Sequence, residues 1–458
     1  MGHRLSHQQD ELERRPRFHT WKRGRRAAPL VDQVLIGVGF AVLFFLLPHA
    51  LVGDDFTRFA DIETLIHHGQ LSNSQFSLVM PLASAPFLLL GELIRSPDWW
   101  AARFNVIVVA AGVLAAFRLL RGRMDAGLLA KLVLLLLFMS FLTNRLRDYN
   151  AEVFTATAVA LGIVLLVTGR RGFIGWTAIV IGVVNAPATL VGLLLITGSE
   201  AVRRRRLRCL TPVVVAAALI MVEAWARRGG PLVTGYEGNH GFKTILPYSG
   251  KAGFSYPFLL GVLSILFSFG RGLLFFTPGI ALWPSSRTRR LAQPYRPATV
   301  LMLLFLCGQV LVYAKWWAWY GGLSWGPRFF VFAAIPSSLF IALRLHAAAN
   351  SRRTDPLVLL LLSLSAWVGI SGAIGDPTTL GFCANDQYAL ESMCWYTPEF
   401  SSLWHPLVQF PTLTTSVTIV VIYSTIVFAY LAAPAVAGLG RALIARRPSA
   451  EWAKSWRF

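Results

Sequence analysis

The feature that most constrains the fold is a succession of long apolar runs separated by short clusters of arginine. Hydrophobic residues make up 55% of the 458 residues and charged residues only 14%, whereas a soluble chain carries about 25% charged residues. Uncharged apolar runs of this length are typical of membrane-spanning helices. We therefore expect an all-α polytopic membrane protein with about 12 transmembrane helices.

The positions of the basic residues predict the orientation of these helices. A net charge of +21 could indicate nucleic-acid binding, but the cations stand in clusters between apolar runs and form no continuous stripe. This distribution follows the positive-inside rule. It predicts no nucleic-acid partner, a multi-pass protein of the bacterial inner (plasma) membrane, and both termini in the cytoplasm. The clusters include Lys22–Arg26, Arg118–Arg123, Arg203–Arg208, Arg287–Arg290 and Arg352–Arg353.

The chain divides into one large unit and two basic ends. We expect a disordered cytoplasmic arm over residues 1–30, a transmembrane domain over 31–435 and a basic cytoplasmic tail over 436–458. Keeping every arginine cluster inside requires that residues 75–94 lie in the interface or re-enter the membrane. For the same reason only one of the runs 257–269 and 270–283 should cross. Asn185-Ala186-Pro187 predicts a broken helical hairpin between residues 173 and 197.

Two adjacent carboxylates, Asp54 and Asp55, follow the first apolar run, where its helix leaves the membrane. Carboxylates at that depth are costly unless they are protonated, bind a metal or serve chemistry. They could act as a general base toward an acceptor hydroxyl or hold a divalent cation. The competing interpretation is a solvated helix end. Apolar residues at helical spacing between positions 59 and 66 predict an amphipathic interfacial helix.

A second outer loop carries charges of both signs. Arg145, Arg147, Asp148 and Glu152 lie on the predicted outer side, against the positive-inside trend. The two arginines must meet an anion there. That anion is either a lipid or substrate group, or the two acids of the same loop in a local salt-bridge network.

Further candidates occur in the second half of the chain. Arg271 stands between two glycines among apolar runs, where it could bind phosphate or snorkel to lipid headgroups. Trp319, Tyr320 and Trp325 belong to an aromatic loop that fits either an interfacial belt or a sugar platform. Cys383 and Cys394 share one polar loop and could close a disulfide in an oxidising compartment.

Several segments together resemble the GT-C superfamily of membrane glycosyltransferases, in particular bacterial members related to protein mannosyltransferases. Asp54-Asp55-Phe56-Thr57-Arg58-Phe59-Ala60-Asp61, with the later His68-Gly69, is similar to the acidic first-loop motif of that superfamily. Tyr320-Gly321-Gly322-Leu323-Ser324-Trp325-Gly326-Pro327-Arg328 and Phe267-Ser268-Phe269-Gly270-Arg271-Gly272 are similar to two further segments. Residues 75–94 and the break at residues 185–188 resemble its short helices.

The resemblance implies an inverting hexosyl- or pentosyltransferase that uses a polyprenyl-phosphate sugar on the extracytoplasmic face. Asp54 would be the general base, with Asp55 positioning it or holding a divalent cation. Arg271 and Arg328 would bind the donor phosphate. The substrate pocket would include Arg147, Asp148, Glu152, Trp319, Tyr320 and Trp325. The large C-terminal extracytoplasmic domain of some members is missing here, and the predicted outer loop 375–410 is the candidate for a minimal counterpart, so a glycan, a lipid or a protein remains open as acceptor.

Two other functions compete with this interpretation. A transporter or flippase of a lipid-linked saccharide would need charged or broken helices near the middle of the membrane, but the predicted spans are almost free of acids. A non-catalytic scaffold would need a larger outer surface than these loops offer. We therefore expect a transferase, with the flippase as the alternative.

Overall fold

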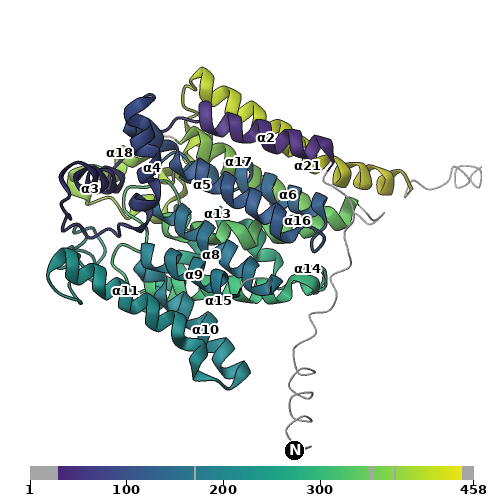
Figure 1. Cartoon of the computed structure of the whole chain (residues 1–458). Helices are drawn as coiled ribbons and strands as arrows, with labels where there is room; N and C mark the ends of the chain where they lie inside the picture. Colours follow the sequence, from purple (N-terminus) through teal and green to yellow (C-terminus); the bar gives the residue numbers. More distant parts are fainter. Residues whose placement is uncertain (1–28, 170–171, 350–354, 376–377, 446–458) are drawn as a thin grey trace, which may run out of the picture.

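The computed structural model describes residues 29–169, 172–349, 355–375 and 378–445. Its regular elements in these ranges are helices, besides one isolated bridge between His240 and Ala252. Figure 1 shows them as a bundle whose long helices run roughly parallel. The bounds of the main helices are α2 Leu30–Phe45, α3 Asp54–His68, α4 Val79–Leu93, α5 Pro97–Leu120, α6 Ala126–Phe138, α7 Leu142–Arg145, α8 Ala151–Thr168, α9 Gly172–Asn185, α10 Leu190–Arg204, α11 Thr211–Arg228, α12 Phe258–Phe267, α13 Leu273–Phe276, α14 Ser286–Ala292, α15 Arg296–Tyr313, α16 Ala334–Ala349, α17 Pro356–Ile374, α18 Thr378–Ala384, α19 Met393–Tyr396, α20 His405–Val408 and α21 Thr415–Ala445.

Seven helical segments of the described chain are long and apolar enough to cross a membrane, and five shorter apolar helices accompany them. The protein is therefore an all-α polytopic membrane protein, as the apolar runs predicted. The seven segments are Pro97–Leu120, Ala151–Thr168, Leu207–Arg228, Ser286–Tyr313, Arg328–Ala348, Pro356–Ile374 and Thr415–Arg441. The five shorter helices are α2, α4, α6, α9 and α12.

Local sequence signals set the ends of several helices. The Asn150 side chain accepts the Glu152 N–H at the start of α8, and Asp125 accepts the Leu128 N–H at the start of α6. Such caps satisfy amides that have no partner inside the helix. At two crossings glycine allows contact between backbones: a Cβ at Gly369 would lie 1.8 Å from the Phe138 carbonyl oxygen, and one at Gly308 would lie 2.3 Å from the Gly192 nitrogen.

The two ends of the bundle differ in their charges. At the end far from Asp54, Arg344 pairs with Asp355 at 2.5 Å, and Arg287 reaches the same carboxylate at 3.1 Å. Arg123 donates to the Thr168 carbonyl there, at the end of α8. The arginine clusters within α14 and at the end of α5 thus share one end, as the charge pattern predicted. We call it the arginine end and the other the Asp54 end.

The segments that were expected not to cross stay at the Asp54 end. In α4, the Met80 N–H donates to Asn185 Oδ1 at 2.9 Å, and Gly91 packs on Pro97 at the start of α5. Figure 1 shows α3 and α4 gathered at the left end of the bundle, while α14 lies at the right. Asn185 is also the last residue of α9, where the predicted broken hairpin turns at Pro187 into α10.

The two apolar runs on either side of Arg271 also behave differently. Helix α12 keeps to the Asp54 end, where Ser264 bonds the Tyr396 hydroxyl. Residues 273–282 instead lead toward Ser285, whose hydroxyl accepts from Arg344 at the arginine end. One run therefore crosses the bundle and the other does not, as expected from charge.

The predicted bounds of the transmembrane domain stay a prediction. Helix α21 continues to Ala445, past the boundary expected at residue 435, because its composition remains helix-forming beyond Pro434. Most of the predicted arm, residues 1–28, and the last part of the tail, residues 446–458, lie outside the described residues, as do Arg352 and Arg353.

Candidate active site

A polar cavity of about 390 Å³ opens at the Asp54 end of the bundle. Three stretches that are far apart in the sequence form most of its wall, and Gly375 at the end of α17 completes it. The three stretches are the start of α3 with the segment before it, the segment between α6 and α8, and the glycine-rich loop before α16. The wall residues are Pro48, His49, Ala50, Val52, Gly53, Asp54, Asp55, Asn144, Arg145, Arg147, Asp148, Asn150, Gly321, Gly322, Leu323, Ser324, Trp325, Arg328 and Gly375.

Asp54 begins α3 and is held by an arginine from the other half of the chain. Arg328 donates from Nη2 to Asp54 Oδ2 at 2.7 Å. About a third of the Asp54 side chain, 33%, remains exposed to the cavity. The first turn of a helix favours a carboxylate because its free N–H groups carry partial positive charge. The ion pair joins the first-loop motif to the glycine-rich loop. The sequence had marked both residues as candidates without pairing them.

Asp55 is the buried member of the acid pair, with 7% of its side chain exposed. One oxygen accepts the Tyr149 N–H at 3.1 Å, and the other lies 3.7 Å from Arg58. Burial raises the pKa of Asp55 to about 7, with a further rise from the charge of Asp148 and an opposing effect of Arg58. A carboxyl group with a pKa in this range can exchange a proton at neutral pH.

The segment between α6 and α8 brings two arginines and an acid to the cavity. Arg145 lies 3.4 Å from Asp148, and burial raises the pKa of Asp148 against the pull of the neighbouring arginines. Arg147 instead donates to the carbonyl oxygens of Ala373 and Ile374, both at 3.3 Å. Among the described residues, no carboxylate forms an ion pair with Arg147. Its guanidinium is therefore the cation of this cavity that is best placed to meet an added anion.

Arg271 does not line the polar cavity, and its contact with a donor phosphate stays a prediction. Its guanidinium is buried and donates to the carbonyl oxygens of Gly322, Ser324 and Gly326. These carbonyls belong to the glycine-rich loop, residues 321–328, which ends at Arg328. The flanking glycines let the segment approach closely: a Cβ at Gly270 would lie 1.9 Å from the Cys394 carbonyl oxygen. Arg271 thus fixes the shape of a loop that itself lines the cavity.

Two of the three aromatic residues that were predicted to contact the sugar lie outside the wall of the polar cavity. Trp319 and Tyr320 are buried in an aromatic core outside the cavity wall, and Tyr320 stacks on Trp395 with ring centroids 4.0 Å apart. Trp325 does line the cavity, and its indole N–H donates to the Ser402 carbonyl at 3.2 Å. Most of the aromatic side chains of this loop therefore pack in the protein interior and do not form an open surface for a sugar ring.

Glu152 was predicted for the pocket but lies beside it. It lines a small neighbouring cavity together with Gln309, Tyr313 and Phe329. Sequence reasoning missed His49 and Asn144, which do line the polar cavity. Asn144 donates to the Gly372 carbonyl, and His49 bonds the Leu43 carbonyl. Isolated residues of these types carry no spacing signal, so only the tertiary structure identifies them.

The predicted disulfide is present between Cys383 and Cys394, whose Cα atoms are 6.0 Å apart. It closes the segment that carries Glu391, a buried acid that accepts the Tyr320 hydroxyl at 3.0 Å. Burial raises the pKa of Glu391 to about 7. The disulfide lies at the Asp54 end. The Trp395 carbonyl next to it accepts the Gly270 N–H, and the adjacent Arg271 holds the glycine-rich loop that lines the polar cavity.

Within the described residues, no group of three or more His, Cys, Asp or Glu side chains could hold a metal ion. A divalent cation at Asp54 and Asp55 would have to complete its coordination with other oxygen donors, such as a substrate phosphate. The predicted cation therefore stays a prediction.

No model of a known protein family matches the chain, and no curated protein matches it. Among solved structures, the crystal structure of ArnT from Cupriavidus metallidurans bound to undecaprenyl phosphate is similar over 89% of this chain and 77% of that protein. The TM-score is 0.47 and the sequence identity 16%. At this level of likeness, the function of the chain must be argued from its own residues.

Proposed function

We propose that this protein is an inverting membrane glycosyltransferase that moves a hexose or pentose from a polyprenyl phosphate to a cell-envelope acceptor. The observation that supports it best is the convergence of Asp54, Asp55 and Asp148 with Arg145, Arg147 and Arg328 on one cavity at the end of a membrane bundle. Such a site offers a base, cations for a leaving phosphate, and access for a lipid-linked donor. The motifs that resemble the GT-C superfamily supply two of the three walls.

In this mechanism Asp54 accepts the proton of an acceptor hydroxyl. The hydroxyl oxygen then bonds to the anomeric carbon of the sugar from the face opposite the phosphate. The bond between that carbon and the phosphate oxygen breaks, and the polyprenyl phosphate leaves with the electron pair. Attack from the opposite face inverts the configuration. Asp54 suits this role because a third of its side chain is exposed to the cavity while Arg328 orients it.

The leaving phosphate needs cations, and the arginines of the cavity differ in whether they already pair with a carboxylate. Arg147 has no carboxylate partner among the described residues, whereas Arg145 and Arg328 each pair with an acid. We assign Arg147 as the first contact of the donor phosphate, with Arg328 as the second. Donors aimed at the charge that develops in the transition state stabilise it strongly in a site with little water. Trp325 in the cavity wall is the remaining candidate for sugar contact.

The proposal includes an orientation. The polar cavity faces the extracytoplasmic side of the bacterial inner membrane, and both termini lie in the cytoplasm. Two features support this: the arginine clusters gather at the far end of the bundle, and the Cys383–Cys394 disulfide lies at the Asp54 end. The acceptor is a glycan, a lipid or a protein that reaches the cavity from outside.

The test is transfer by purified protein from labelled polyprenyl-phosphate sugars to envelope acceptors. Replacing a general base typically lowers the rate by a factor of about 10² to 10⁴. We expect Asp54→Asn to lose transfer to this extent while it retains the fold and donor binding. Asp98→Asn, an acid of α5 outside the cavity wall, is the matched control and should keep full activity. Full transfer by both Asp54→Asn and Asp55→Asn would refute the mechanism, and flux of intact donor without product would favour a flippase.

A further inference from the structure

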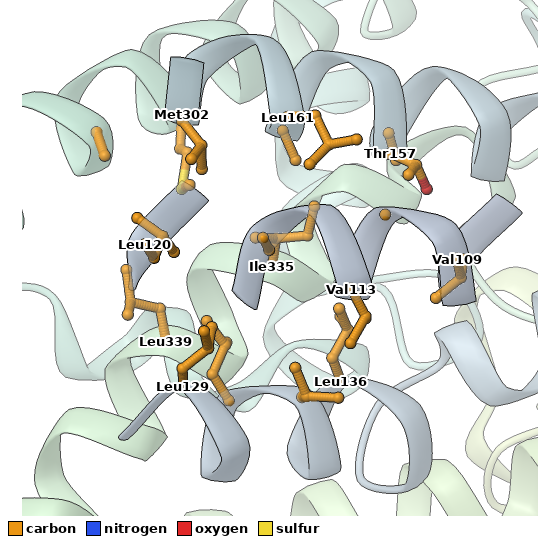
Figure 2. A pocket seen from close by; sticks show the side chains of 18 of the residues that line it. Val109, Val113, Leu120, Leu129, Leu136, Thr157, Leu161, Met302, Ile335 and Leu339 are labelled. Carbon is orange, nitrogen blue, oxygen red and sulfur yellow. The ribbon is translucent and has the colours of Figure 1, made fainter. Parts of the chain in front are cut away.

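A second cavity lies inside the bundle, and Figure 2 shows that apolar side chains surround it. It has a volume of about 140 Å³ and is lined from α5, α6, α8, α15 and α16. Figure 2 shows a single oxygen among the drawn side chains, on Thr157, and a single sulfur, on Met302. An apolar void of about 150 Å³ stays dry and accepts small hydrocarbon groups. We call this space the apolar cavity.

The wall of the apolar cavity reaches the surface of the bundle, because several of its lining side chains are partly exposed. Val113 and Ala116 of α5 and Leu132 and Leu136 of α6 line it and remain partly exposed. Helix α5 packs mainly on α4 and α8, whereas α6 packs mainly on α16 and α2, so α5 and α6 make little contact with each other. This surface belongs to the apolar part of the bundle, where hydrocarbon chains of the bilayer are the surroundings. A chain can therefore enter from the side.

Exposed arginines stand beside the end of the apolar cavity that is far from Asp54. Leu120 lines the cavity, and exposed Arg121 follows it directly; Tyr295 lines the cavity, and exposed Arg296 follows it. Both positions lie at the arginine end, where α5 ends and α15 begins. A guanidinium matches the geometry of a phosphate oxygen pair and attracts anionic headgroups. The rim is thus complementary to a negatively charged lipid.

We propose that the apolar cavity holds a short stretch of one acyl chain of an anionic bilayer phospholipid, the rest of which lies in the surrounding bilayer, and that its headgroup phosphate binds Arg121 and Arg296. The site is separate from the proposed transferase site. The wall runs along α5 from Val109 to Leu120, roughly 16 Å at the helical rise per residue. The lipid comes from the leaflet opposite the polar cavity, so the inference does not depend on the proposed function.

The experiment uses the full chain purified in detergent, with phosphatidylglycerol or phosphatidylcholine of the same acyl chains added back. Native mass spectrometry counts the retained lipid, and thermal unfolding reports its stabilising effect. We expect phosphatidylglycerol to be retained and to raise the melting temperature more than phosphatidylcholine does. Each arginine near a membrane surface contributes about fivefold to anionic-lipid binding, so Arg121→Gln combined with Arg296→Gln should remove most of the preference.

Two further variants separate the two parts of the site. Ala116→Phe fills the cavity at its partly exposed wall and should lower retention of both lipids, since it blocks the acyl chain and leaves the arginines intact. Arg208→Gln removes an exposed arginine that does not adjoin the cavity wall and should change neither measurement. Equal retention of both lipids, an unchanged preference in the double arginine variant, or polyprenyl phosphate as the lipid displaced by Ala116→Phe would each overturn the proposal.

Discussion

At the scale of single residues, the two adjacent carboxylates of α3 have different surroundings. Asp54 faces the cavity in an ion pair with Arg328, and Asp55 points into the protein toward the Tyr149 N–H. Adjacent residues of a helix point about 100° apart, so one side chain can be wet while its neighbour is buried. The residue pattern marked both as candidates, and only the family resemblance gave them different roles.

The buried acid predicts how stability depends on pH. The pKa of Asp55 is raised to about 7 in the folded protein from 3.8, so the folded state binds this proton more tightly than the unfolded state. Stability should therefore fall as pH rises from about 4 to about 7, by on the order of 4 kcal/mol, and level off above that. Thermal unfolding of the purified protein across this range measures it. Asp55→Asn should make the fall of stability with pH smaller, with the remainder coming from Glu391 and Asp148, whose pKa values burial also raises. An unchanged profile in this variant would contradict the assignment.

Arg271 predicts a second residue-scale effect, through the glycine-rich loop. Arg271→Lys keeps the charge but loses the planar donors that bridge three carbonyls. We expect about tenfold slower transfer, the equivalent of one lost hydrogen bond, and faster tryptic cleavage after Arg328. Arg228→Lys is the matched control, because Arg228 also donates to backbone carbonyls, those of Ser74 and Val233, away from this loop. Unchanged cleavage with a raised donor KM would instead indicate direct phosphate contact.

At the scale of elements, the end of α17 positions the proposed phosphate ligand. Gly375 ends this helix in the left-handed conformation, and a Cβ there would lie 1.6 Å from Arg147 Nη1. The helix terminus also presents the Ala373 and Ile374 carbonyls that hold the guanidinium. Arg147 therefore stays in place because Gly375 leaves room for its guanidinium.

Gly375→Ala should displace Arg147 and raise the donor KM. Gly229→Ala provides the control, since Gly229 ends α11 in the same left-handed conformation with nothing within 4 Å of an added Cβ. Both variants share a backbone penalty of about 1 kcal/mol, so they should lose similar stability. Steady-state kinetics at varied donor concentration then reports the effect of displacing Arg147 alone. Equal KM values in the two variants would argue against Arg147 as a phosphate ligand.

At the scale of the whole molecule, the fold places the polar cavity and the arginine end at opposite ends of the bundle. The polar cavity and the disulfide lie at the Asp54 end, while Arg287 and Arg344 meet Asp355 at the other. A bundle with one strongly basic end has a defined direction in a membrane, because cationic loops are retained in the cytoplasm.

This direction can be measured by labelling of engineered cysteines. In a background with Cys209→Ser and Cys307→Ser, Lys251→Cys lies in the loop at the Asp54 end and Gln293→Cys lies at the arginine end; both positions are exposed. An impermeant maleimide should label position 251 in intact cells and position 293 only after permeabilisation. The reverse pattern would place the polar cavity in the cytoplasm and exclude the proposed extracytoplasmic reaction.

The sequence alone determined the class of protein, the segments that stay at one end of the bundle, and the first-loop acids as candidates. These features follow from hydropathy and charge along the chain, which act locally through the cost of placing charges in a bilayer. Only the tertiary structure decided which cations reach the cavity. Arg271 and Arg147 are both predicted on the outer side, and both donate to backbone carbonyls of distant segments, but of the two Arg147 alone lines the polar cavity. That difference depends on which segments pack together, and local patterns do not encode it.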